Sequence, residues 1–185
     1  MINAVFTEKM RKLLQNLVGK ELRFYECQKN RTANRIFGNF RIYYDASALE
    51  ISNEEKVFPF FDSEEDMTCF ACHEVLTSEP FQPVVLGEVE KIYVGDRIQA
   101  IEIIQDDITV SEDQYHVVFD AALVIRMAHK TLMFARDAWF SQVITIVEND
   151  DYDHIYPVEN VIDTWSNDGE YQVAVKRTRQ VLKSI

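Results

Sequence analysis

The chain has 185 residues, of which 47% are hydrophobic and only five are Gly and four Pro. This composition excludes a largely disordered chain and suits one packed domain. Lys and Arg total 19 against 31 Asp and Glu, a formal net charge of −12, which argues against nucleic acids and anionic membrane surfaces as partners because both select basic patches.

The first residues, Met1 to Glu8, lack the basic region and the apolar core of a signal peptide. No apolar run approaches the roughly 20 residues that a membrane-spanning helix needs. We therefore expect a cytoplasmic protein. In that reducing compartment, the three cysteines, Cys27, Cys69 and Cys72, are expected to be free thiols.

The N-terminal segment predicts an amphipathic helix over residues 7–18. Its apolar side chains fall on one helical face: Phe6, Met10, Leu13, Leu14, Leu17 and Val18. Thr7 can cap the start of this helix, and Gly19 can end it.

After Gly19 the apolar period falls to two, which is typical of strands. Strands are expected within residues 22–26, 36–44, 49–51, 89–94, 98–104, 108–110, 115–120 and 143–147. The apolar segments 122–127 and 131–135 flank the polar pair His129-Lys130 and favour a hairpin over the alternative of one long buried helix.

Residues 62–76 allow two interpretations. Ser63 and Asp66 resemble a capping box ahead of a helical face, whereas the residues from Met67 to Cys72 also alternate as in a strand. The sequence leaves helix and strand open here.

The C-terminal part predicts an acidic loop over 148–154 and then a short helix that runs from Pro157 to Trp165. Ser166 to Gly169 is a turn signal, and Gly169 is expected at positive φ. A final strand over 171–183 closes the chain.

These elements predict an α+β domain spanning residues 1–185. Its mostly antiparallel, twisted sheet is expected as a curled sheet or a barrel-like sandwich, covered by the N-terminal helix and one or two short helices. Val18-Gly19-Lys20 resembles Val94-Gly95-Asp96, which suggests an internal duplication with structural halves 18–90 and 94–165. A functional site would then lie near the seam between the halves.

One short motif carries candidate chemistry. Cys69-Phe70-Ala71-Cys72-His73 fits the pattern that attaches c-type haem, but that attachment takes place outside the cytoplasm. A zinc site would need two distant ligands, and a redox dithiol would need to begin a helix. The favoured interpretation is that these are small apolar residues that fill a half-buried element. No metal or cofactor is predicted.

Other catalytic patterns are weak. The five glycines are isolated, which argues against phosphate-binding loops and a nucleophile elbow. The carboxylate pairs Asp106-Asp107 and Glu64-Glu65 are expected at the surface. The acidic run 148–154 could hold a cation but lacks EF-hand spacing. Aromatic residues of the last third, such as Trp139 and Trp165, fit core packing better than exposed binding anchors.

The sequence thus names no catalytic, cofactor or metal residue, and whether the protein is an enzyme stays open. The first hypothesis is a binding or regulatory protein that acts through protein contacts, with a basic partner favoured by its charge. The alternative is an enzyme or small-ligand receptor whose scattered residues meet in a cleft between two sheet halves. The oligomeric state is not predicted.

Overall fold

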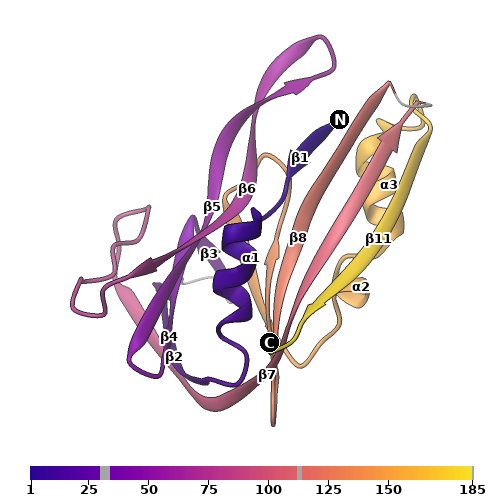
Figure 1. The fold of residues 1–185 in the computed structure, drawn as a ribbon. Helices are drawn as coiled ribbons and strands as arrows, with labels where there is room; N and C mark the ends of the chain where they lie inside the picture. Colours follow the sequence, from indigo (N-terminus) through magenta and orange to yellow (C-terminus); the bar gives the residue numbers. More distant parts are fainter. Residues whose placement is uncertain (30–33, 112–113, 185) are drawn as a thin grey trace.

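Antiparallel sheet makes up most of the computed structural model, which describes residues 1–29, 34–111 and 114–184 (Figure 1). The strands are β1 (Ile2–Ala4), β2 (Glu21–Gln28), β3 (Arg35–Phe37), β4 (Asn39–Tyr44), β5 (Ser47–Phe60), β6 (Ser63–Val75), β7 (Val89–Val110), β8 (Tyr115–Met127), β9 (Thr131–Arg136), β10 (Val143–Glu148) and β11 (Val173–Leu182). The helices are α1 (Glu8–Gln15), α2 (Tyr152–Ile155) and α3 (Val158–Ser166). The expected combination of a mostly antiparallel sheet with a few short helices is confirmed.

The strand order across the sheet is β3-β10-β9-β8-β7-β2-β4-β5-β6, with β1 added to β8 and β11 added to β7. Among the described strands this path is open, because β3 and β6 end it, so the sheet is not a closed barrel. Two meanders, β2-β4-β5-β6 and β7-β8-β9-β10, meet where β2 pairs with β7.

The internal duplication stays a prediction. Gly19 and Gly95 both have positive φ, but Gly19 precedes β2 whereas Gly95 lies inside β7. A superposition of residues 18–62 on 94–137 would test the division into halves 18–90 and 94–165.

The longest strand, β7, joins the two parts of the sheet. It has 22 residues, where the sequence suggested three separate strands. Its first half pairs with β2, and its second half pairs with both β8 and β11. Figure 1 shows β7 sweeping below the molecule from one part to the other. Pairing with neighbours therefore carries the strand across the polar interruptions at 95–97 and 105–107, although the register with β2 shifts beside Gly95 and the register with β8 shifts between Ile104 and Gln105.

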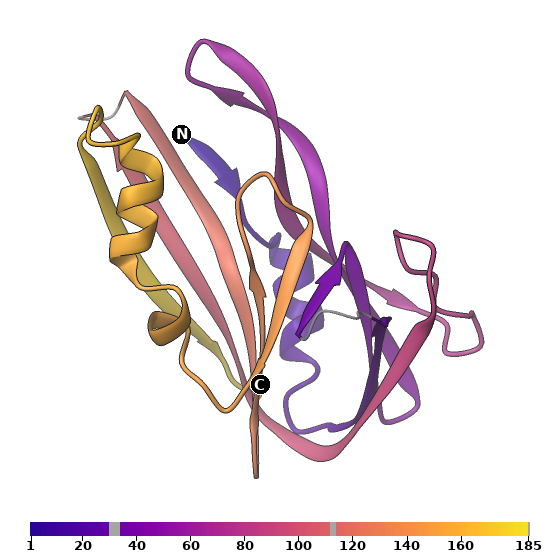
Figure 2. The ribbon, with the colours of Figure 1, turned by 180° about the vertical axis from the view of Figure 1, so that it is seen from behind.

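The ambiguous segment 62–76 is a strand. β6 pairs with β5 along its whole length, from Phe60↔Ser63 at the turn to Ala48↔Val75. The β5–β6 ladder provides hydrogen-bond partners for backbone N–H and C=O groups along the whole segment, whereas a capping box provides them only at the end of a helix. β5 is correspondingly longer than the predicted 49–51, and the hairpin tip projects beyond the rest of the sheet (Figure 2).

The helices follow their sequence signals closely, with one addition. Thr7 accepts a hydrogen bond from the backbone N–H of Met10 and begins α1, which ends at Gln15 rather than at residue 18. α3 begins after Pro157 as expected. α2 interrupts the predicted acidic loop because Asp151 caps it. The hairpin of β8 and β9 is confirmed, as is the positive φ of Gly169, which is +88°.

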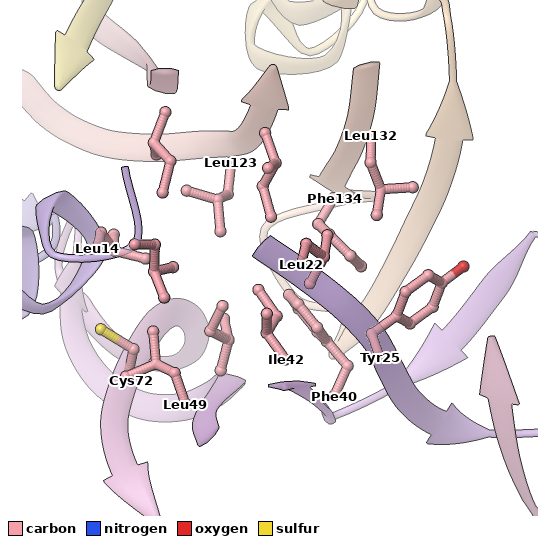
Figure 3. Packing of buried hydrophobic residues seen from close by; sticks show 14 of the residues in the cluster. Leu14, Leu22, Tyr25, Phe40, Ile42, Leu49, Cys72, Leu123, Leu132 and Phe134 are labelled. Atoms are coloured by element: carbon pink, nitrogen blue, oxygen red, sulfur yellow. The ribbon is translucent and has the colours of Figure 1, made fainter. Parts of the chain in front are cut away.

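Two hydrophobic clusters lie on opposite faces of the β7–β11 part of the sheet. One contains α1 and both meanders, and includes the Phe40 and Phe134 rings stacked at 3.9 Å (Figure 3). The other packs α2 and α3 against β7, β8 and β11. None of the described helices is long and apolar enough to cross a membrane.

Candidate functional site

A cavity of about 450 Å³ lies beside the second cluster. Three parts of the chain enclose it: the tip of the β5–β6 hairpin, the segment around the end of β9, and the α2–α3 region. Its lining residues are Phe60, Phe61, Phe119, Arg136, Asp137, Ala138, Trp139, Phe140, Tyr152, Tyr156, Asn160, Val161, Thr164, Trp165, Asn167 and Tyr171. The volume falls in the range of pockets that hold small organic ligands.

Aromatic rings form most of the wall. Trp139 and Trp165 meet edge to face at 5.0 Å, and Phe119 lies 4.1 Å from Trp139 between ring centroids. Phe60 approaches Trp165 at 6.1 Å and Phe140 at 5.7 Å. Both tryptophans are buried, so neither forms an exposed patch. The aromatics of the last third therefore pack as a core and, in addition, surround a cavity.

The hairpin tip is held against this wall by a residue with strained backbone. Phe61 lies in the turn between β5 and β6 and has a φ of +51°, which is uncommon for a bulky side chain. Its ring stacks on Tyr115 at 4.9 Å and on Tyr171 at 5.5 Å. These contacts offset the backbone strain and bring the first meander to the cavity of the second.

Arg136 is the one charged residue of the wall that is almost fully buried, with 4% of its surface exposed. It ends β9 just after the last β8–β9 pair, Ala122↔Ala135. Its Nη2 donates to the carbonyl and the hydroxyl of Thr68, and its guanidinium lies 5.1 Å from the Phe119 ring centroid. Burial lowers the pKa of Arg136 to about 10, so the side chain remains a cation at neutral pH.

Several donors of the wall have no acceptor. Within the described residues, four buried side-chain polar atoms make no hydrogen bond, and three of them belong to wall residues: Nε and Nη1 of Arg136 and Nε1 of Trp165. Unsatisfied buried donors are costly. Three of the four unpartnered atoms therefore belong to residues that line one cavity.

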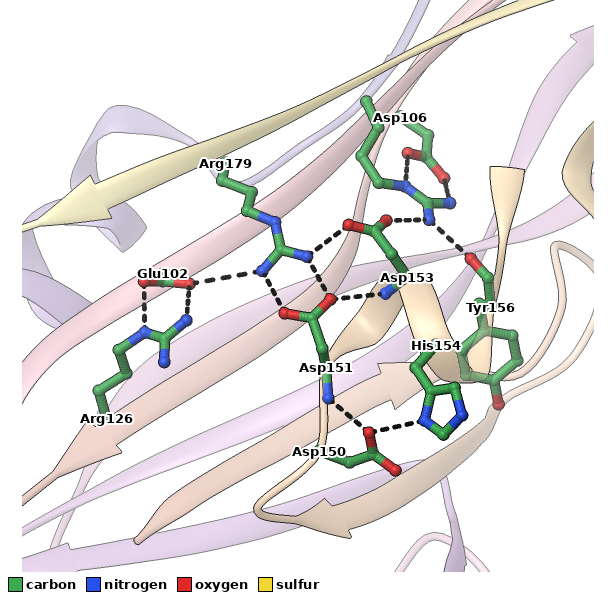
Figure 4. A network of polar contacts seen from close by, with 10 residues as sticks. Glu102, Asp106, Arg126, Asp150, Asp151, Asp153, His154, Tyr156 and Arg179 are labelled. Atoms are coloured by element: carbon green, nitrogen blue, oxygen red, sulfur yellow. Dashed lines mark hydrogen bonds and ion pairs between the residues drawn. The ribbon is translucent and has the colours of Figure 1, made fainter. Parts of the chain in front are cut away.

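A network of ion pairs holds the part of the cavity wall that comes from α2 and the residue after it (Figure 4). Arg177 on β11 donates to both oxygens of Asp106 at 2.6 and 2.8 Å, and its Nη1 reaches Asp153 at 2.7 Å and the Tyr156 carbonyl at 2.6 Å. Arg179 binds Asp151 and Asp153. The network therefore clamps α2, with its wall residues Tyr152 and Tyr156, onto the sheet.

This network corrects one expectation. Asp106 is fully buried rather than at the surface, and the Arg177 side chain that pairs with it is 7% exposed. Their sequence separation of 71 residues hides the pairing. Asp107, in contrast, is partly exposed and contacts His116, and Glu64 and Glu65 are exposed as expected.

The C-x-x-C-H motif does not form one site. Cys69 and Cys72 belong to different hydrophobic clusters, because residues three apart on a strand point to opposite faces. All three cysteines are buried free thiols, and burial raises the pKa of Cys72 to about 12, which disfavours the thiolate. In the ranges that the structure describes, no cluster of three or more His, Cys, Asp and Glu side chains could hold a metal ion.

The predicted seam between β2 and β7 borders a second, more open depression. Gly19, Gly95 and exposed polar residues such as Lys20 and Asp45 line it. It has none of the aromatic wall of the first cavity, which lies away from the seam. Sequence reasoning missed Arg136, although one signal was present: a charged residue that directly continues the apolar run Leu132–Ala135.

No protein-family model, no curated protein and no solved structure matches this chain.

Proposed function

We propose that the protein is a receptor for a small, largely apolar organic molecule, which it binds in the cavity between the hairpin tip, β9 and α3. The observation that supports this proposal is a cavity of about 450 Å³ with a largely aromatic lining, to which two residues with unsatisfied buried donors, Arg136 and Trp165, contribute. Apolar walls supply affinity and a few placed polar groups supply orientation. This develops the small-ligand alternative of the sequence analysis.

Binding is favoured over catalysis by the state of the polar groups around the cavity. Burial raises the pKa values of Tyr152 and Tyr156, so neither phenol is ready to act as a base at neutral pH. The Asp137 carboxylate already accepts a hydrogen bond from the Tyr156 hydroxyl at 3.0 Å. These groups orient the wall.

Intrinsic fluorescence offers a direct test, because both tryptophans of the chain line the cavity. Titration with the neutral dye N-phenyl-1-naphthylamine is expected to quench or shift tryptophan emission saturably, with a stoichiometry of about one per chain. Val161→Phe places a larger side chain into the cavity and should weaken binding by about tenfold or more, as a steric clash does to a preformed pocket.

Ile162→Phe is the matched control, since Ile162 is on the same helix but does not line the cavity. Its affinity should equal that of the wild type. Absence of saturable binding, or equal loss in both variants, would contradict the receptor proposal.

A protein-contact function is our second proposal, and a different surface supports it. The connection between β6 and β7 exposes apolar side chains, with Leu86 96% and Leu76 65% exposed. Isolated exposed apolar residues are ordinary, but a group on one connection marks a contact surface. Leu86→Asp should abolish concentration-dependent association in sedimentation experiments if the contact joins two copies of this chain; an unchanged wild-type monomer at all concentrations would contradict self-association.

A further inference from the structure

The Arg136 guanidinium has donor capacity that the protein does not use. An arginine side chain carries five N–H groups. Nη2 is occupied by Thr68, while Nε and Nη1 make no hydrogen bond. The guanidinium also lies near the rings of Phe119 and Trp139, at 5.1 and 5.5 Å, both of which line the cavity. The unused donors therefore belong to the Arg136 guanidinium, which lies beside aromatic rings of the cavity wall.

No carboxylate among the described residues accepts a hydrogen bond from Nε or Nη1 of Arg136. Asp120 interacts electrostatically with Arg136, but its oxygens accept hydrogen bonds from the Phe6 backbone at 2.6 Å and from Gln105 at 2.9 Å. Asp137 also lines the cavity, and its Oδ1 accepts from Tyr156. Arg136 is thus a buried cation for whose Nε and Nη1 donors the described residues supply no acceptor.

We infer that the ligand is an aromatic or similarly apolar monocarboxylate, whose carboxylate accepts hydrogen bonds from Arg136 while its apolar body packs against Trp139, Trp165 and Phe60. This inference rests on the proposed receptor function and names its ligand class. Guanidinium and carboxylate form strong charge-assisted hydrogen bonds, most of all where water is excluded. Trp165 Nε1 supplies a further donor for a second polar group of the ligand.

The surrounding charge selects a monoanion over a phosphate dianion. Arg136 is the only cationic residue among those that line the cavity in the described parts of the chain, and Asp137 lies on the same wall. The chain as a whole carries −12. A second negative charge on the ligand would have no partner and would be repelled.

A matched pair of probes tests the inference in the wild-type protein. 1-Naphthaleneacetic acid and 1-naphthaleneacetamide share shape and aromatic body, but only the acid is an anion at pH 7.5. The acid is expected to bind more tightly by about tenfold or more, the usual scale for a charge-assisted hydrogen bond. 1-Naphthyl phosphate, a dianion at this pH, should bind more weakly than the acid.

Variants then assign the preference to one residue. Arg136→Met should abolish the acid's advantage while leaving amide affinity within about twofold, whereas Arg23→Met removes an exposed positive charge on β2 and should leave the advantage intact. Equal wild-type affinities for acid and amide would overturn the inference, as would tighter binding of the phosphate. If the neutral dye still binds in that case, the receptor proposal stands; if no probe binds, the receptor proposal itself fails.

Discussion

Arg136 and Arg177 both have nearly inaccessible side chains but opposite surroundings. Arg177 is held by both oxygens of the buried Asp106, by Asp153 and by a backbone carbonyl. Among residues 1–29, 34–111 and 114–184, Arg136 donates only to Thr68, and two of its nitrogens have no acceptor. Burial alone would lower the pKa of Arg177, but the hydrogen bonds that Arg177 donates to the Asp106 and Asp153 carboxylates raise that pKa above its usual range. Burial lowers the pKa of Arg136 to about 10.

The difference in acceptors suggests different roles: Arg177 stabilises the fold, whereas we propose that Arg136 binds a ligand. A buried cation costs free energy unless partners satisfy it. Arg177 has these partners within the chain and uses them to attach α2 to the sheet. Arg136 lacks them among the described residues, which is why we propose that a ligand supplies the acceptor. Burial by itself does not distinguish Arg177 from Arg136, but the hydrogen-bond acceptors around each side chain do.

The largest expected loss of stability comes from breaking the ion pair between Arg177 and Asp106. Asp106→Ala leaves Arg177 buried without its carboxylate, which should lower the free energy of unfolding by about 3–5 kcal/mol. Urea denaturation followed by circular dichroism measures it. Asp107→Ala is the matched control, because this neighbouring carboxylate is partly exposed and should cost less than about 1 kcal/mol. Similar losses in both variants would show that the buried pair has no special structural role.

The same substitution at the two arginines sharpens the comparison. Arg177→Met orphans Asp106 and should be strongly destabilising. Arg136→Met removes an uncompensated charge but also the bonds to Thr68, so the free energy of unfolding should change by no more than about 1 kcal/mol without ligand. Thermal and urea denaturation of both variants would check this. A large loss for Arg136→Met would mean that Arg136 is a structural residue after all.

The smallest effect concerns pH. Hydrogen bonds from Arg177 and Arg179 lower the pKa of Asp153, so its stabilising contribution is complete above the ordinary aspartate value of about 4 and is lost as pH falls through the lower folded-state pKa. Because Asp153 is half exposed, Asp153→Asn should cost only about 0.5 kcal/mol at pH 7.

This cost should disappear as the pH falls below the lowered folded-state pKa of Asp153, because the wild-type carboxylate is then protonated as well. Asp62→Asn, in the exposed turn between β5 and β6, removes an equal charge far from the network and serves as the control. A cost that persists unchanged at low pH would contradict an electrostatic origin.

Local patterns predicted much of the fold. Alternating apolar residues marked most strands, Thr7 marked the start of α1, and Asp168-Gly169 marked a turn with positive φ. The break at His129-Lys130 separated β8 from β9. These signals are local because hydrogen bonding and steric limits act over a few residues. Residues 62–76 stayed ambiguous because local signals do not show the pairing with β5, and this pairing makes the segment a strand.

The candidate site could not be predicted in this way. Trp139 and Trp165 are 26 residues apart and touch only when α3 packs on the sheet, and Phe60 reaches them from the other meander. The sequence by itself determined the strands, the turns, the helix caps and the acidic charge. Tertiary structure alone decided that Arg177 pairs with Asp106 while Arg136 pairs with no carboxylate in the part of the chain that the structure describes. Pairing depends on which side chains long-range strand contacts bring within about 3 Å of one another.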